Sequence, residues 1–161
     1  MARWQQVLDA APELATAVQA RFDAYGLGLL GTLRRDGWPR LSGVEPLFAG
    51  GELWLGMMPN SLKAKDLFRD GRFALHNATT DKQVTEGDAR ITGIARFVES
   101  EEETAYYRRA FEEHAGYPPG EGEFHLFRGD VREISMIRPG GDFLNIDWWR
   151  EGDATHHVDR R

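Results

Sequence analysis

The sequence predicts an α+β fold, mainly β with a few helices, in which short antiparallel strands form a small barrel. Apolar runs separated by turn signals recur along most of the chain and predict six or seven strands. These strands do not alternate regularly with helices, which argues against a doubly wound parallel sheet. An Asp36-Gly37 pair between two apolar runs is typical of a tight antiparallel hairpin.

The first half of the chain is expected to begin with a helix over residues 12–25. Its first residue is a proline, and Leu14, Val18 and Phe22 form one apolar stripe four residues apart. Gly26 is a helix stop. Three strands are then expected to pair as an antiparallel meander. They cover residues 27–33, 40–48 and 52–57. Glycine and proline inside the second strand predict a bulge or an edge there.

A second helix is expected over residues 60–69, with Leu62, Leu67 and Phe68 on its buried side. A capping box, S-x-x-E, opens a third helix at Ser100. The remaining elements are expected to be two strands at 72–78 and 88–98, then two or three strands within 124–127, 130–138 and 143–149, followed by a loose polar tail at about 151–161.

Composition indicates one globular domain over residues 1–161, with an N-terminal helical extension at about 1–26. Hydrophobic residues make up 41% of the chain, which is typical of a folded protein. The absence of cysteine excludes disulfides, thiolate metal sites and cysteine nucleophiles. The N-terminus does not resemble a signal peptide and no apolar run is long enough to span a membrane, so a cytoplasmic protein is expected.

Charge is unevenly distributed along the chain. The net charge of −6 argues against a nucleic-acid partner, which would need a basic face. Residues 34–72, however, carry seven basic and five acidic side chains, a net +2, against −8 for the rest. This window is expected to attract a small anion.

Within that window, the stretch from Pro59 to Lys65 has the chemistry of an anion site. A strand ends and a helix begins there, where backbone N–H groups lack intrahelical partners, next to the hydroxyl of Ser61 and the ammonium of Lys63. The alternative interpretation is a capped surface helix with solvated lysines. Lys65 fits either interpretation. The His156-His157 pair lies in the expected tail, and no metal site is predicted.

Two longer runs resemble the pyridoxamine 5′-phosphate oxidase-like, FMN-binding split β-barrel superfamily. The first is LGTLRRDGWPRLSGVEPLFAGGELWLGMMPNSLKAKDLFRDGRFALHNA, and the later pieces are DARITGIARFV and FHLFRGDVREISMIRPGGDFLNIDWWREG. The resemblance covers roughly residues 27–152. It implies a six-stranded Greek-key split barrel and a homodimer with cofactor sites at the subunit interface. It also implies bound FMN or, in some branches, the deazaflavin F420 or haem.

The resemblance also implies a set of cofactor-binding residues. The family's phosphate signature, S-R/x-K, falls on Ser61-Leu62-Lys63, with leucine where relatives often carry arginine. A glutamine that some members place near the ring falls on Asp88. In the family, one strand lies against the isoalloxazine ring and the segment before the phosphate-binding helix lines the cofactor. These two segments contribute the remaining residues of the implied set. The full implied set is Arg40, Leu41, Ser42, Gly43, Gly56, Met57, Ser61, Leu62, Lys63 and Asp88.

The function implied is that of an FMN-dependent oxidoreductase acting on a small-molecule substrate with an electron donor, both unidentified. An F420-dependent reductase, or a non-catalytic flavin or haem carrier or sensor, is the alternative. The R-L-x-P ending of true pyridoxamine phosphate oxidases is absent, which argues against that activity. No side chain stands out as a catalytic acid or base.

Overall fold

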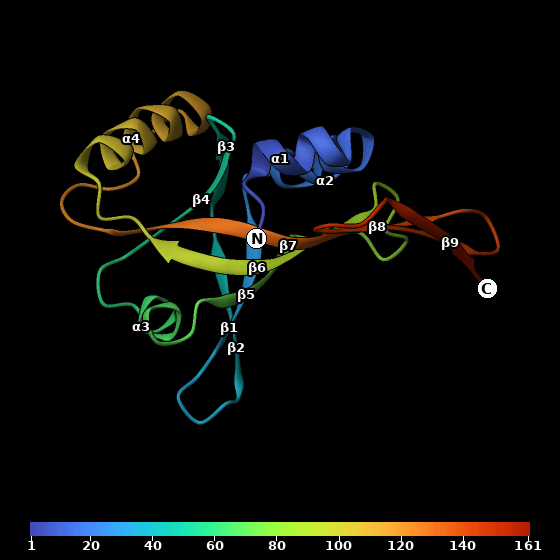
Figure 1. Cartoon of the computed structure of the whole chain (residues 1–161), viewed down its shortest axis with the longest axis horizontal. Helices are drawn as coiled ribbons and strands as arrows, with labels where there is room; N and C mark the ends of the chain where they lie inside the picture. Colours follow the sequence, from blue (N-terminus) through green and yellow to red (C-terminus); the bar gives the residue numbers. More distant parts are fainter.

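One antiparallel sheet that curls into a barrel organises the chain, and helices pack on its outside (Figure 1). The computed structural model describes residues 1–161. The helices are α1 (Trp4–Ala10), α2 (Pro12–Asp23), α3 (Leu62–Arg69) and α4 (Glu101–Ala115). The strands are β1 (Gly28–Leu33), β2 (Pro39–Val44), β3 (Pro46–Ala49), β4 (Glu52–Met57), β5 (Arg72–Asn77), β6 (Asp88–Phe97), β7 (His125–Pro139), β8 (Leu144–Arg150) and β9 (His156–Arg160). None of the helices combines the length and apolarity needed to cross a lipid bilayer.

The barrel closes through one bent segment, β2–β3. Its first half pairs with β1, with Leu41 opposite Gly31, and its second half pairs with β4, with Leu47 opposite Trp54. Only Glu45 separates the halves. The other barrel pairings are β1–β5, β5–β6, β6–β7 and β7–β4. When β2 and β3 are counted as one strand, the barrel has the six strands that were predicted. The predicted meander consists of β1, β2–β3 and β4 and forms part of this barrel.

The C-terminal part differs from the sequence-based expectation. The two strands expected at 124–127 and 130–138 are one continuous strand, β7, which runs from barrel to arm. The tail expected to be loose contains β9, which pairs with β8 from Leu144–Arg160 to Trp148–His156. These strands form an arm that projects from the barrel and carries the C-terminus (Figure 1). The tail is ordered because β8 offers it an unpaired backbone edge.

The main core fills the barrel and the space beneath α1 and α2. The predicted stripe of Leu14, Val18 and Phe22 is buried there, as is Trp149 from β8. A smaller core lies under α4, where Tyr107 and Phe111 pack with apolar residues of β3, β4 and β7. Ser100 caps α4 as predicted, because its hydroxyl accepts from the N–H of Glu103, 3.2 Å away.

The buried side of α3 is not the one predicted. Leu67 is buried, but Leu62 and Phe68 are exposed, and a carboxylate, Asp66, is buried instead. Ala64 completes the buried face. The apolar residues at 62 and 68 therefore belong to the outer surface of the molecule.

Asp66 anchors α3 to the barrel. It accepts hydrogen bonds from the Thr32 hydroxyl at 2.8 Å, from Arg40 Nε at 2.6 Å and from Arg69 at 3.2 Å. Burial alone would raise the pKa of Asp66, but these three donors outweigh burial and hold the pKa below its ordinary value. The carboxylate is therefore charged and joins α3 to β1 and β2.

We expect Asp66→Ala to lower the free energy of unfolding by about 3 kcal/mol, because it leaves the Arg40 guanidinium without its partner in a half-buried place. Urea unfolding at neutral pH measures this change. The control is Asp70→Ala. Asp70 lies at the C-terminal end of α3 and forms an exposed ion pair with Arg72, so its loss should lower the free energy of unfolding much less than the loss of Asp66.

A pH series provides the internal check on this anchor. A carboxyl with a depressed folded-state pKa stabilises the fold above its unfolded pKa of about 3.9 and loses that contribution as the pH falls through the folded value. The difference between wild type and Asp66→Ala should therefore shrink in acid. A constant difference down to about pH 2 would contradict the assignment.

Candidate functional site

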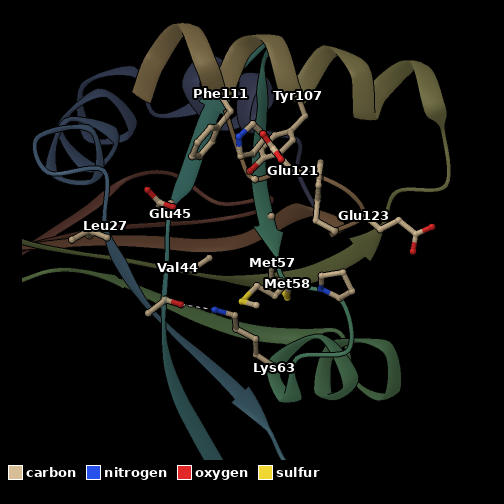
Figure 2. A pocket seen from close by; sticks show the side chains of 16 residues that line it. Leu27, Val44, Glu45, Met57, Met58, Lys63, Tyr107, Phe111, Glu121 and Glu123 are labelled. Atoms are coloured by element: carbon tan, nitrogen blue, oxygen red, sulfur yellow. Dashed lines mark hydrogen bonds between the residues drawn. The ribbon is translucent and has the colours of Figure 1, made fainter. Parts of the chain in front are cut away.

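A cavity of about 510 Å³ opens between α4, the ends of β2 and β4, and the start of α3 (Figure 2). The loop between α4 and β7 forms its outer wall through residues 119–123. A volume of this size is in the range of ligand and cofactor sites. Apolar side chains from β2, β4, α4 and the adjoining loops line much of it, and a few polar groups converge on it.

Four of the predicted cofactor-binding residues meet in this cavity. Gly43 comes from β2, Gly56 and Met57 from β4, and Lys63 from the first turn of α3. They are far apart in sequence and are brought together because β2–β3 crosses from one side of the barrel to the other. The structure thus collects the central part of the predicted set.

Lys63 is held in place on one side of the cavity. Its Nζ donates to the carbonyl oxygen of Gly43 at 2.6 Å, as the dashed line in Figure 2 shows. This carbonyl is available because β2 pairs only with β1. Burial lowers the pKa of the Lys63 ammonium. A nearby anion would stabilise the charged form of this side chain.

Ser61 and the first turn of α3 form the donor group that the sequence predicted. The Ser61 hydroxyl accepts from the N–H of Ala64 at 3.3 Å, as an N-cap does. Its own O–H remains free to donate. The N–H groups of Leu62 and Lys63 have no intrahelical partner because they precede the first helical hydrogen bond. Lys65 is exposed and does not line the cavity.

The other predicted residues lie outside the cavity. Arg40 is paired with Asp66, which argues against its serving as a free phosphate cation. Leu41 and Leu62 are 70% and 59% exposed, and Ser42 lies between Leu41 and Gly43 on β2. These side chains line no part of the cavity within this chain.

Asp88 lies elsewhere in the molecule. It begins β6, pairs with Ile137 and accepts from the Thr79 hydroxyl at 2.8 Å. It faces a groove beside the β8–β9 arm, together with Phe143 and Leu144. Within one chain, Asp88 therefore does not line the cavity that Lys63 lines.

Sequence reasoning missed two side chains of the cavity, Tyr107 and Glu45. Tyr107 comes from α4, is 2% exposed and places its hydroxyl against Gly56. Glu45 lies at the bend between β2 and β3 and accepts a hydrogen bond from the Tyr117 hydroxyl. Tyr107 and Phe111 are spaced i, i+4 along α4, and this spacing by itself indicates only a buried helix face.

Close packing at Gly56 supplies a test of the cavity floor. A Cβ at this position would lie 2.3 Å from the Tyr107 hydroxyl oxygen, so Gly56→Ala should lower the free energy of unfolding by about 1–3 kcal/mol. Adding Tyr107→Phe removes that oxygen and should recover part of the loss, which a double-mutant cycle in urea measures.

The control for this cycle is Gly43→Ala, because nothing lies within 4 Å of a Cβ placed there. Strictly additive effects of Gly56→Ala and Tyr107→Phe would show that the hydroxyl does not pack on Gly56 in solution.

Comparison with known proteins supports the architecture. Residues 14–138 match the family model described as pyridoxamine 5′-phosphate oxidase. No curated protein sequence matches the chain. Among solved structures, a pyridoxamine 5′-phosphate oxidase-related, FMN-binding protein from Nostoc punctiforme is similar with a TM-score of 0.64 and 13% identity, over 94% of this chain and 96% of that chain.

Two further structures differ in what they bind. PhzG from Burkholderia lata, in complex with tetrahydrophenazine-1-carboxylic acid, gives a TM-score of 0.66 and 16% identity, over 97% of this chain and 92% of that chain. A haem-binding protein from Mycobacterium smegmatis gives 0.61 and 23%, over 83% of this chain and 57% of that chain. At these identities the likeness shows the shared fold.

Proposed function

Because the chain belongs to the pyridoxamine 5′-phosphate oxidase family, we propose that it is a flavin-dependent oxidoreductase that binds FMN in the cavity beside Lys63. The carrying observation is that Lys63 lines a cavity of about 510 Å³ at the start of α3, where Ser61 and two unpartnered helix N–H groups also lie, although Ser61 itself does not line the cavity. Such a group of donors matches a phosphate, and the cavity beside it has room for an attached ring system.

The chain's own residues would divide the binding as follows. The hydroxyl of Ser61, the ammonium of Lys63 and the N–H groups that open α3 would hold the phosphate. Gly43 and Gly56 have no side chains, so a flat ring can approach the backbone of β2 and β4 closely. FMN, when bound, supplies the electron and hydride transfer, and the protein supplies position and electrostatics. The substrate is a small molecule.

FMN is favoured over F420 because the cations that would serve an acidic tail are not in the cavity. Arg40 is paired with Asp66, and Glu45, Glu121 and Glu123 line the cavity instead. The absorption spectrum of the purified protein separates flavin from deazaflavin and from haem. The same spectrum therefore also tests whether the protein is a haem carrier.

Lys63→Ala should weaken FMN binding by about 1–3 kcal/mol, a factor of about 5 to 150 in the dissociation constant, because one charge-assisted hydrogen bond to the phosphate is lost. Quenching of flavin fluorescence during titration measures the constant. Lys65→Ala is the matched control, since it removes the same charge from the exposed side of the same helix.

An unchanged dissociation constant for Lys63→Ala would refute the phosphate assignment. Equal losses for Lys63→Ala and Lys65→Ala would mean that only the overall charge of the helix matters. Urea unfolding of both variants separates a loss of binding from a loss of folding.

We also propose that the protein is a homodimer whose seam includes the outer face of β1, β2 and α3. Leu29, Leu41 and Leu62 are exposed on these three elements. Met58, just before α3, is 77% exposed. Exposed apolar side chains gathered in this way are typical of a protein interface. A seam there would also cover the mouth of the proposed cofactor site.

Leu41→Asp should raise the dimer dissociation constant at least about tenfold, because it places a charge in an apolar interface. Sedimentation velocity across a concentration series measures it. Tyr25→Asp, at an exposed aromatic after α2, should leave the association state unchanged. A Leu41→Asp protein that sediments as the wild type does would contradict the proposed seam.

A further inference from the structure

Strand β9 is held to the rest of the molecule by few contacts. It pairs only with β8, at the outer end of the arm in Figure 1. None of its five side chains is buried, and none belongs to either core. A strand held mainly by one backbone ladder is marginally stable, so a single side-chain contact can decide whether it stays paired.

One histidine of β9 joins the two strands. His157 lies directly opposite Asp147 of β8 in the ladder. Its Nδ1 is 2.6 Å from Asp147 Oδ1, and its Nε2 is 2.9 Å from Oδ1 of Asp159, two residues further along β9. Both nitrogens of the imidazole therefore face carboxylate oxygens, one across the ladder and one along the strand.

This arrangement requires a charged imidazole. A carboxylate can only accept hydrogen bonds, and a neutral imidazole has one N–H donor and one bare nitrogen. The neutral ring would set the lone pair of that nitrogen against one of the two carboxylates, whereas the charged ring donates to both. The hydrogen bonds to Asp147 and then to Asp159 accordingly raise the pKa of His157 above its ordinary value of 6.5.

The other charged groups of the arm do not substitute for the proton on His157. From β7, Arg138 donates to the second oxygen of Asp147 at 3.1 Å and leaves the first oxygen to the histidine. Arg150 of β8 and Arg160 of β9 lie on the opposite face, because side chains alternate along a strand. The charges that act on His157 itself are those of its two carboxylate partners.

The neighbouring histidine has no such requirement. His156 stacks on Trp148 of β8, with ring centroids 5.1 Å apart and an angle of 16° between the planes. Its Nε2 lies 2.9 Å from Oδ2 of a single carboxylate, Asp153. A neutral ring can donate this one hydrogen bond, so the contact survives loss of a proton. Of the two adjacent histidines, only His157 makes the pairing of β9 depend on its charge.

We propose that β9 is a pH-controlled latch, docked on β8 while His157 is charged and released from β8 when His157 loses its proton. Because the folded-state pKa is the higher one, the contribution of His157 is complete below the unfolded pKa of about 6.5 and is lost as the pH rises through the folded value. Release uncovers the backbone edge of β8. It also removes Arg160 and Arg161 from the groove that Asp88 and Leu144 line.

Hydrogen exchange of the full chain, followed by mass spectrometry between about pH 6 and about pH 8.5, tests this release. Exchange rates are converted to protection factors, which removes the intrinsic pH dependence of exchange. We expect the protection of residues 156–160 to fall about three- to fivefold as the pH rises, the scale of one exposed charge contact. Residues 72–77, which form β5 inside the barrel, should keep a constant protection and so report that the fold is intact.

Two matched variants assign the effect to one histidine. Asp159→Asn places an amide beside His157, and an amide N–H can donate to the bare nitrogen of the neutral ring, so residues 156–160 should stay protected across the whole pH series. Asp153→Asn changes the carboxylate that contacts His156 instead, and it should retain the wild-type fall in protection.

Carbon-13 NMR titration of the His157 ring in the same proteins gives the pKa of this group directly. Wild-type protection that does not change with pH, or a midpoint of its fall that differs from the measured pKa of His157, would overturn the latch. A fall that persists in Asp159→Asn, or that disappears in Asp153→Asn, would also overturn it.

Discussion

The bend at Glu45 is the constraint on which the rest of the site depends. A straight strand over residues 39–49 would stay beside β1 and leave the barrel open next to β4. Gly43 and Pro46 flank the bend, and proline cannot donate to a ladder, so regular pairing with one partner is interrupted there. The chain therefore leaves β1 and joins β4. The same bend leaves the Gly43 carbonyl free for Lys63 and places Glu45 at the cavity.

The position of α3 is fixed on two sides by contacts of different kinds. Inside, Asp66 draws Thr32 of β1 and Arg40 of β2 to the helix through charge-assisted hydrogen bonds. Outside, Lys63 donates to Gly43 on the same strand. Because both contacts reach β2, the helix N-terminus cannot shift without moving the strand that closes the barrel. A donor group held in this way is preorganised for an anion, so little ordering is needed when one binds.

Local signals in the sequence predicted the elements well. The Asp-Gly hairpin, the Ser100 cap and the stripe of Leu14, Val18 and Phe22 depend on neighbours a few residues apart, and the structure has all three. The helix start at Ser61 was likewise predicted from the sequence, and Ser61 caps α3 while Lys63 lines the cavity. The family resemblance then supplied the strand order, which no local pattern contains.

The features that sequence reasoning missed depend on distant partners. Asp66 is buried because Thr32 and Arg40, more than 25 residues away, satisfy it, so α3 turns Leu62 outward. The tail forms β9 only because β8 has a free edge. Tyr107 had the spacing of an ordinary core residue, and only the absence of a side chain on Gly56 opposite it reveals a hydroxyl at a cavity floor.

The two ends of the cavity differ in charge. Lys63 and the start of α3 favour a negative charge, whereas Glu45 and Glu121 favour a positive one. Tyr107 remains protonated because burial and the charge of Glu45 raise its pKa, so its hydroxyl acts as a donor and not as a base. Under the proposed function the protein's contribution would be one of orientation, because FMN would carry the reactive chemistry.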